Sequence, residues 1–226
     1  MNLHRAPSTE SIARMPGETH DHGSSDSMIL VTGASGFVGA AVVRALLARG
    51  EQVRVLVRST SDHRNIEGLE LEIVEGDLLT PETLSRAVDG CTGVYHLAAD
   101  YRLWTRDPES MFRVNLEGSR AVVLAAMKAG VQRIVYTSSV AVLGIIPDGE
   151  GKEDTPVDYA DMVGVYKQSK YRAEEAVRRL IIEERAPVVI VNPSTPVGPG
   201  DIKPTPTGRM IVEAASGKMP AYVDTG

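Results

Sequence analysis

The sequence predicts an α/β domain with a doubly wound parallel sheet that helices cover on both faces. From residue 28 onward, short runs rich in β-branched residues alternate with helical stretches, which is the pattern that buried parallel strands and their crossover helices produce. Glycine and proline stand where such helices would end and begin. With 42% hydrophobic and 24% charged residues, the composition is that of a chain able to bury a core.

The expected elements follow one another in a regular order. The apolar runs that indicate strands lie at residues 28–32, 53–57, 71–74, 94–97, 133–137 and 188–191. The stretches that indicate helices lie at residues 37–49, 81–88, 107–129 and 158–184. Gly50 and Gly130 directly follow two of these helices, and Pro81 opens a third. The alternation predicts that successive strands are parallel and joined through helices.

Residues 1–27 differ in composition from the rest of the chain. They are rich in Ser, Thr, Pro, Gly, His, Glu and Asp, and they lack the apolar stretch that a secretory signal requires. We expect this segment to be a disordered tail. Because Met28 opens the first expected strand, we expect the folded part to begin there.

Charge and cysteine content exclude several classes of function. The chain has 24 Lys and Arg against 30 Asp and Glu, and the acidic residues are spread along it, so binding of nucleic acid has no electrostatic basis. The single cysteine, Cys91, forms no internal disulfide and indicates a reducing compartment, which we take to be the cytoplasm. The longest apolar stretch, residues 134–146, contains polar residues and is shorter than the about 20 residues that span a bilayer. We expect no membrane span and no metal site.

A glycine-rich turn follows the first expected strand. Gly33, Gly36 and Gly39 lie in the run Thr-Gly-Ala-Ser-Gly-Phe-Val-Gly. The first glycine allows a tight turn, the second lets backbone amides approach a pyrophosphate, and the third lets the next helix pack on the sheet. Because the N-terminus of that helix then faces the anion, the turn predicts a dinucleotide site; the alternative is a glycine-rich turn without a ligand. The other predicted contacts of this turn are Ser35, Phe37 and Val38.

The end of the second expected strand predicts which dinucleotide binds. An acidic residue there favours a free ribose 2′-hydroxyl, whereas an arginine accommodates a 2′-phosphate. Arg58 directly follows the strand, Arg64 is close by, and the nearest acid, Asp62, is displaced into the loop. We therefore favour NADP(H) over NAD(H). The alternative role of Arg58 is that of a solvated surface charge.

A tyrosine and a lysine four residues apart predict acid/base chemistry, because Tyr166 and Lys170 share one face of an expected helix. A phenol with a pKa of about 10 is a weak catalyst at neutral pH, but a nearby ammonium group lowers that pKa. Tyr166 would then exchange a proton with a substrate oxygen while hydride moves to or from nicotinamide, and Lys170 would hydrogen-bond the nicotinamide ribose. The alternative is an exposed pair on a helix surface.

Two serines follow the fifth expected strand, at the edge of the sheet where ligands of this architecture bind. We expect Ser139 to face the substrate and to polarise its carbonyl or bind its alkoxide. Ser138 is expected to lie nearer the cofactor. Each serine could instead cap the end of the strand.

Taken together, these motifs resemble the extended short-chain dehydrogenase/reductase family, also called the NAD-dependent epimerase/dehydratase family. The matching segments occur in family order and are residues 32–39, 76–78, 96–99, 115–118, 137–144, 166 with 170, and 192–199. Within the family, residues 98–104 and 192–207 are most similar to hopanoid-associated sugar epimerases, with dihydroflavonol 4-reductases as relatives. The resemblance implies a Rossmann domain over residues 28–198 and the start of an incomplete substrate-binding region over residues 199–226.

The resemblance also implies roles for further residues. Asn115 would support a proton relay, and Tyr101 and Trp104 would contact the substrate together with the loop at residues 145–157. A homodimer through the two long expected helices is implied as well. The residues implied to bind the cofactor are Asp77, Leu78, Leu97, Ala98, Ala99, Thr137, Ser138, Tyr166, Lys170, Pro193, Ser194, Thr195 and Pro196.

The predicted activity is that of an NAD(P)-dependent enzyme acting on a small-molecule substrate. A carbonyl reductase and a sugar epimerase that works through a keto intermediate both start from this arrangement, so the sequence leaves both open. Family chains are usually longer, and an open pocket neither excludes water nor positions a substrate well. We therefore expect dinucleotide binding with impaired turnover for these 226 residues. The alternative is a catalytically impaired dinucleotide sensor or scaffold.

Overall fold

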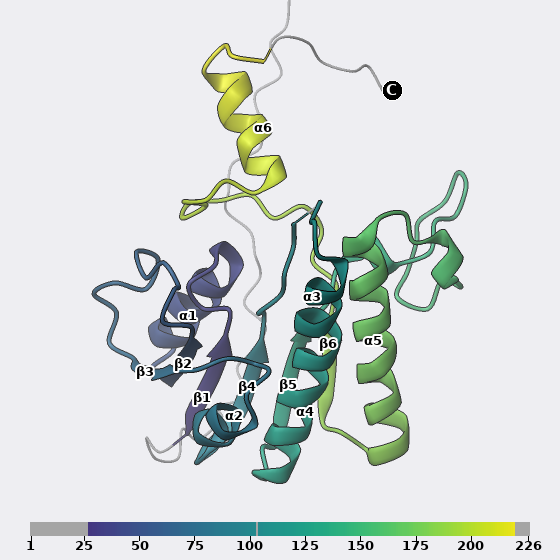
Figure 1. Ribbon diagram of the computed structural model, residues 1–226. Coiled ribbons are helices and arrows are strands. Elements are labelled where there is room, and N and C mark those ends of the chain that lie inside the picture. Colours follow the sequence, from purple (N-terminus) through teal and green to yellow (C-terminus); the bar gives the residue numbers. More distant parts are fainter. Residues whose placement is uncertain (1–26, 103, 220–226) are drawn as a thin grey trace, which may run out of the picture.

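The computed structural model describes residues 27–102 and 104–219. Within them, a wholly parallel six-stranded sheet has the order β3-β2-β1-β4-β5-β6 (Figure 1). The strands are β1 (Met28–Thr32), β2 (Gln52–Val57), β3 (Glu72–Glu75), β4 (Cys91–His96), β5 (Arg133–Thr137) and β6 (Val188–Val191). The predicted fold class is confirmed. Apart from Ser27, the expected disordered tail lies outside the described residues, as do residues 220–226 of the expected substrate-binding region.

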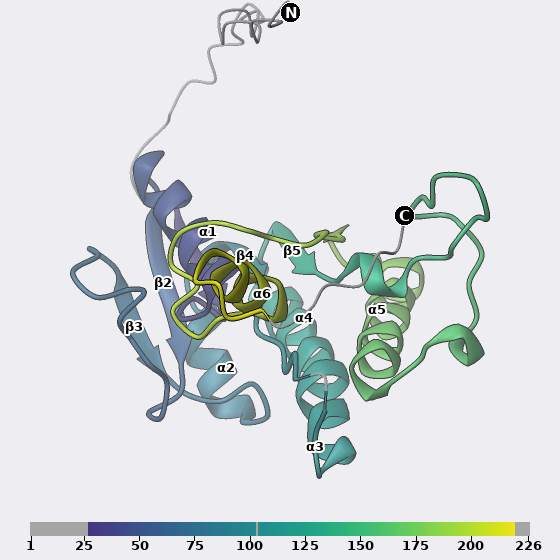
Figure 2. The ribbon, with the colours of Figure 1, turned by 90° about the horizontal axis from the view of Figure 1, so that it is seen from above.

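Helices cover both faces of the sheet. α2 (Pro81–Val88), α4 (Ser119–Lys128) and α5 (Val165–Glu184) pack on one face, and α1 (Phe37–Ala48) packs on the other (Figure 2). α6 (Pro206–Ala215) lies beyond the edge of the sheet at which the strands end (Figure 1). The remaining helical segments are α3 (Pro108–Phe112), the π-helical turn η1 (Arg113–Gly118) and the 3-10 turns η2 (Val140–Val142) and η3 (Tyr159–Asp161).

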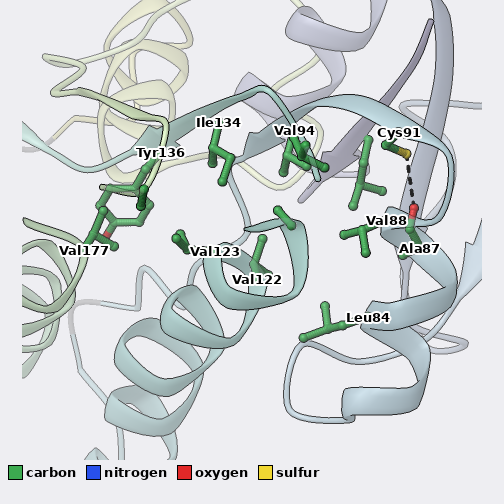
Figure 3. Close-up of a cluster of buried hydrophobic side chains, with 14 of the residues drawn as sticks. Leu84, Ala87, Val88, Cys91, Val94, Val122, Val123, Ile134, Tyr136 and Val177 are labelled. Carbon is green, nitrogen blue, oxygen red and sulfur yellow. Dashed lines mark hydrogen bonds between the residues drawn. The ribbon is translucent and has the colours of Figure 1, made fainter. Parts of the chain in front are cut away.

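The larger hydrophobic core lies between the sheet and helices α2, α4 and α5 (Figure 3). Leu30, Val94 and Ile134 come from the neighbouring strands β1, β4 and β5, and they are fully buried in one cluster with Val122 of α4 and Val177 of α5. A second cluster lies beneath α1 and contains Val31, Ala34, Val43, Leu46, Val53, Val55, Val57 and Ile66. β1 is apolar over residues 28–31, which is why the sequence pattern identified it, whereas β4 opens with Cys91, Thr92 and Gly93, and the pattern found only its second half.

The segment expected to form one helix at residues 107–129 is helical throughout but not uniform. Asp107 caps its first turn by accepting a hydrogen bond from Ser110 N at 3.0 Å. The segment begins as α3, widens into the π-helical η1 and returns to α-helical geometry in α4. Wide turns of this kind are rare and occur frequently at functional sites. Asn115, one of the predicted functional residues, lies in this turn.

The helix expected at residues 158–184 begins later than predicted. A capping box between Asp158 and Asp161 closes the short turn η3, and Gly164 then has a φ of +92°, which a right-handed helix does not accommodate. α5 therefore starts at Val165. Smaller differences are that β3 starts and ends one residue later than predicted, that β4 starts at Cys91 and ends at His96, and that α6 was not predicted.

The strand order reverses between β1 and β4, the two strands at the centre of the sheet. Along the chain the sheet grows from β1 to β3 in one direction and from β4 to β6 in the other. In open parallel sheets the crevice outside the carboxyl ends of the strands at such a reversal is where ligands bind. Among the residues that the structure describes, no helix combines the length and the apolar character needed to cross a membrane.

Candidate active site

The glycine-rich turn packs directly against the chain that leaves β4. Gly33 has a φ of +74°, and a Cβ there would lie only 2.6 Å from the backbone N of Ala98. A Cβ at Gly39 would overlap the carbonyl oxygen of Gly33. The turn is closed by a hydrogen bond from Gly36 N to Gly33 O at 3.0 Å. Both glycines are therefore required by close backbone approach, as the sequence pattern predicts.

The N-terminus of α1 is open to an anion. Gly36 is its N-cap and supplies no side-chain hydrogen bond to the first turn, so the N–H groups of that turn remain for a ligand. A cradle of glycine backbone with a helix N-terminus at its end fits the pyrophosphate of a dinucleotide. Of the other predicted contacts, Ser35 accepts a hydrogen bond from Asn65 Nδ2 at 3.2 Å through its carbonyl, the ring of Phe37 lies beside Gly198, and Val38 is half-buried.

The chain after β4 runs alongside this cradle. Leu97 N donates to Thr32 O at 3.1 Å, and Ala98 N donates to Thr32 Oγ1 at 3.3 Å. Leu97 packs against the core beneath α1. The predicted cofactor contacts Leu97, Ala98 and Ala99 thus lie beside the glycine turn at the carboxyl ends of β1 and β4.

The two arginines predicted to favour NADP(H) differ in their surroundings. Arg64 makes a two-pronged contact with Asp62, from Nε at 3.0 Å and from Nη2 at 2.7 Å, and this contact holds the pKa of the Asp62 carboxyl well below its usual range. Arg58 is exposed at the end of β2. Burial alone would raise the pKa of Asp100, but Arg102 and the charge of Arg58 lower it overall. The guanidinium of Arg64 is therefore already engaged, whereas Arg58 extends from the strand end at which a 2′-phosphate would lie.

Asp77 and Leu78 follow the carboxyl end of β3. Asp77 Oδ1 accepts a hydrogen bond from Leu79 N at 2.9 Å, and Thr83 Oγ1 donates to Asp77 O at 2.8 Å. Leu78 packs against Gly118, where a Cβ would lie 3.2 Å from it. The carboxylate of Asp77 is thus held by its own turn, at the same edge of the sheet as the glycine cradle.

Lys170 is buried below the carboxyl end of β5. Only 3% of it is exposed, and its Nζ donates to Thr137 O at 2.9 Å and to Tyr136 Oη at 3.4 Å. Burial lowers the pKa of Lys170 to about 8, and the carboxylate of Glu174 opposes that change. The alternative of an exposed helix-surface pair is therefore wrong for Lys170.

Burial raises the pKa of Tyr166, and the nearby Ser139 hydroxyl offsets this only in part. The expectation that Lys170 lowers the pKa of Tyr166 is therefore wrong for this structure, because the ammonium group is engaged by Thr137 and Tyr136 instead. Ser139 Oγ accepts from Ala141 N at 3.1 Å and caps η2, which is the capping role considered for it, and its role toward a substrate stays a prediction. Ser138, the second predicted serine, is buried at the same strand end.

Asn115 links the loop after β4 to α5. Its side chain accepts from Asp100 N at 2.7 Å, donates to Asp100 O at 2.9 Å and donates to Ser169 Oγ at 2.9 Å. Ser169 in turn donates to Tyr166 O at 2.8 Å. Asn115 is buried and fixes the backbone of the helical turn that carries Tyr166.

The segment after β6 reaches the same cluster. Val140 N donates to Pro193 O at 3.2 Å, and Asn192 Nδ2 donates to Ser139 O at 3.1 Å and to Glu174 Oε2 at 3.0 Å. These hydrogen bonds anchor the chain where it leaves β6, directly before the predicted cofactor contacts Pro193, Ser194, Thr195 and Pro196. Among these, Thr195 has a φ of +40°.

The predicted substrate contacts are not drawn into this cluster. Tyr101 and Trp104 are 51% and 73% exposed, and among the described residues neither side chain has a hydrogen bond to Tyr166 or Ser139. The loop at residues 145–157 forms a separate surface pocket lined by Ile146, Glu150 and Lys152. The described residues contain no group of three His, Cys, Asp or Glu side chains placed to hold a metal ion.

Sequence reasoning missed four buried polar residues around Lys170, which are Tyr136, His96, Ser119 and Glu174. Glu174 had a signal, because it lies one helical turn after Lys170. Tyr136 and His96 are paired across neighbouring strands, and a pairing register of this kind is visible only once the sheet is assembled.

Comparisons with known proteins agree with this geometry. A model of the NAD dependent epimerase/dehydratase family matches residues 29–225. A Synechocystis protein provisionally named a dihydroflavonol 4-reductase is 47% identical over 199 residues, which are 87% of this chain and 57% of that protein. This chain therefore spans somewhat more than half the length of that relative.

Solved structures resemble the chain as well. The crystal structure of gox2253 shares 57% sequence identity with a TM-score of 0.82, over 87% of this chain and 60% of that one. A short-chain dehydrogenase/reductase superfamily protein from Agrobacterium tumefaciens, solved with bound NAD, shares 36% identity with a TM-score of 0.60, over 73% of this chain and 48% of that one. The family match covers nearly all described residues, and the glycine cradle and the strand order agree with it. The chain therefore belongs to the NAD-dependent epimerase/dehydratase family.

Proposed function

We propose that this chain binds NADP(H) and supports hydride transfer between the nicotinamide and a small carbonyl or hydroxyl substrate. Tyr166 is the acid/base, and Ser139 orients the substrate oxygen. The observation that carries the proposal is the burial of Lys170, one helical turn after Tyr166, with its Nζ donating to Thr137 O at the carboxyl end of β5, two strands from the glycine cradle after β1.

The protonation of Tyr166 favours the reductive direction. Because burial raises the pKa of Tyr166, its hydroxyl is protonated at neutral pH and is ready to donate to the oxygen of a carbonyl as that oxygen gains negative charge. Ser139 provides a second polar contact to the same oxygen. When bound, the reduced dinucleotide supplies the hydride for this step. A reductase is also the activity in the name of the Synechocystis relative.

The matching cofactor site is the glycine cradle with Arg58 at its adenosine end. The cradle binds the pyrophosphate through backbone N–H groups, and Arg58 pairs with the 2′-phosphate. Lys170, buried near Thr137, hydrogen-bonds the nicotinamide ribose. A cytoplasmic homodimer through α4 and α5 is part of the same proposal, and the mass of the protein in solution tests the dimer.

Tyr166→Phe separates chemistry from binding. Loss of the proton donor is expected to reduce turnover by about 100-fold or more, while the dissociation constant for NADPH stays within about twofold. NADPH consumption in the presence of a dihydroflavonol, and NADPH binding by fluorescence titration, are the two measurements.

The stoichiometry decides between reduction and epimerisation. A reductase consumes one NADPH for each product molecule, whereas an epimerase returns its cofactor in each cycle. Turnover that survives Tyr166→Phe unchanged would contradict the role of Tyr166 in either reaction.

A further inference from the structure

We propose that Asn192 and Glu174 are positioning residues for Ser139. The side chain of Asn192 joins the backbone of Ser139, just beyond the end of β5, to the carboxylate of Glu174 on α5. α5 is also the helix that carries Tyr166. The meaning of this bridge for turnover rests on the proposed function, whereas the bridge itself is a property of the protein without cofactor.

The carboxamide of Asn192 is the centre of the bridge. Its Nδ2 donates to Ser139 O at 3.1 Å and to Glu174 Oε2 at 3.0 Å. A carboxamide nitrogen carries two hydrogens, so both contacts form at once. Because a carbonyl oxygen and a carboxylate oxygen only accept hydrogen bonds, the nitrogen of the amide, and not its oxygen, must lie between them. Asparagine thus joins two groups that cannot hydrogen-bond each other.

The Glu174 end of the bridge has a fixed orientation. Only 6% of Glu174 is exposed, and its second oxygen, Oε1, accepts from Arg178 Nε at 2.8 Å. Both carboxylate oxygens therefore have a donor. Glu174 lies one helical turn after Lys170 and about two turns after Tyr166, so these three side chains leave α5 on the same side.

The Ser139 end is held by the segment that leaves β6. On either side of Ser139, backbone N–H groups donate to the carbonyl oxygens of residues 191 and 193, at 2.8 and 3.2 Å. Ser139 O accepts from Val142 N at 3.2 Å within its own turn, and from Asn192 across to the neighbouring segment. The backbone of Ser139 thus follows the end of β6, and Asn192 adds the link from there to α5.

The bridge sets where Ser139 lies relative to α5. β5 and β6 are paired in register, but strand pairing does not determine the distance from a strand end to a helix packed on the sheet. A hydrogen bond to a carboxylate is stronger than one between neutral groups, and here it connects the end of β6 to the helix that carries Tyr166. Because the proposed reaction needs Ser139 and Tyr166 at the same substrate oxygen, a displacement of Ser139 by about 1 Å costs turnover.

The carbonyl carbon of Ser139 reports on the bridge in the protein without cofactor. Ser139 and Val140 form the only Ser-Val pair in the 226 residues, so serine labelled with ¹³C at the carbonyl and valine labelled with ¹⁵N give one NMR signal for that peptide bond. A hydrogen bond to a carbonyl oxygen moves its carbon signal downfield. We expect Glu174→Ala to shift the signal upfield, because the carboxamide of Asn192 stays in place but loses the partner that orients it. An unmoved signal would overturn the proposal, because Ser139 would then be placed without Glu174.

Glu174→Gln and Glu175→Ala are the controls. Glutamine offers a carbonyl oxygen to Asn192 in place of the carboxylate, and the side chain of Arg178, which is 47% exposed, can turn into solvent. The Ser139 signal should therefore stay close to its natural position. Glu175→Ala removes a carboxylate from the next position of α5, where its two arginine partners are exposed, and should leave the signal unchanged. A shift with either control that equals the shift with Glu174→Ala would contradict the proposal.

Turnover tests whether the bridge acts through Ser139. Asn192→Leu replaces the carboxamide with an apolar group of similar size and leaves the charge of Glu174 in place. We expect it to lower kcat about tenfold in the natural background. In the Ser139→Ala background it should have no further effect, because both changes remove the same contact to the substrate. Equal losses in the two backgrounds would show that Asn192 acts independently of Ser139, and the proposal would be wrong.

The two kinds of measurement separate this inference from the proposed function. If the Ser139 signal shifts as expected while Ser139→Ala leaves NADPH consumption unchanged, the role of Ser139 in the proposed function is wrong and the bridge is right. If Ser139→Ala reduces turnover while Glu174→Ala leaves the signal unmoved, the bridge is wrong and the proposed function is unaffected.

Discussion

Lys170 is the most unusual residue of the cluster, because it is a charged side chain held almost wholly away from water. Its Nζ has two hydrogen-bond acceptors, Thr137 O and Tyr136 Oη, and Glu174 provides a negative charge one helical turn away. Burial of an ammonium group costs free energy even with such partners. The protein therefore gives up some stability to keep an amine at the carboxyl end of β5.

That cost predicts how stability depends on pH. The pKa of Lys170 is about 8 in the folded protein and about 10.4 in an unfolded chain. Between these values the unfolded state binds the proton and the folded state does not, so the free energy of unfolding rises with pH, by at most about 1.4 kcal/mol per pH unit. Denaturant melts of the natural protein should show this rise relative to Lys170→Met.

Lys128→Met, at the exposed end of α4, is the matched control for removal of a lysine. It should leave the slope between pH 8 and pH 10 unchanged (about the window in which Lys170 titrates). A natural protein whose stability does not rise relative to Lys170→Met in that window would contradict the burial of the amine.

Arg58 is the residue on which the proposed preference for NADP(H) depends. In this proposal its exposed guanidinium at the end of β2 attracts a 2′-phosphate, and Arg58→Asp replaces that attraction with repulsion while supplying an acceptor for a free 2′-hydroxyl. We expect NADPH affinity to fall by about tenfold or more and the NADH to NADPH preference to reverse. Titrations with both nucleotides measure this.

Arg64→Asp is the control, because Arg64 is already paired with Asp62. It should change the ratio of the two affinities less than Arg58→Asp does. If NADPH affinity is the same before and after Arg58→Asp, the assignment of Arg58 is wrong.

At the scale of the elements, periodicity predicted most of the fold. The sheet is covered on both faces, so a strand such as β1 forms an apolar run that is visible in the sequence, whereas the first half of β4 does not. The wide turn η1 and the break at Gly164 were not predicted, because neither interrupts the helical pattern of side chains strongly. α6 was not predicted either; none of its residues is buried, and its apolar side chains Met210, Ile211 and Val212 are exposed.

The candidate site was predictable to the same extent. The glycines and the Tyr166 and Lys170 pair depend on local spacing, which a sequence displays directly. The surroundings of Lys170 depend on the register of β4 against β5, and that is a property of the assembled sheet. The engagement of Arg64 by Asp62 likewise depends on a loop conformation that composition does not determine.

At the scale of the elements, a single added methyl group tests how closely α1 packs against the glycine turn. In Gly39→Ala the new Cβ meets the carbonyl oxygen of Gly33, so either the helix or the turn must move. We expect the free energy of unfolding to fall by about 1–3 kcal/mol and NADPH affinity to fall at least tenfold. Thermal melts and nucleotide titration measure the two effects.

Gly93→Ala is the matched control, because its Cβ would meet neighbours only at 3.8 Å or beyond. It adds a methyl group to β4 at an ordinary van der Waals distance, so stability and NADPH affinity should change little. Equal losses from both substitutions would contradict the argument from close approach at Gly39.

At the scale of the whole molecule, the sheet gathers three separate features at one edge. The glycine cradle follows β1, Lys170 and the proposed acid/base residue Tyr166 lie by the end of β5, and the anchored segment with Asn192 follows β6. These features come from distant parts of the sequence, and the parallel strand order alone brings their ends to the same side. The account therefore requires that one bound nucleotide spans the cradle and the cluster.

Titration with NADPH of protein labelled with ¹³C at the lysine ε-carbon, followed at the Lys170 signal that Lys170→Arg assigns, tests that requirement most directly. The account predicts that this buried signal shifts in step with saturation of the nucleotide site, because the ribose reaches the amine. Saturable binding that leaves the Lys170 signal unmoved, or no binding of NADPH at all, would contradict it.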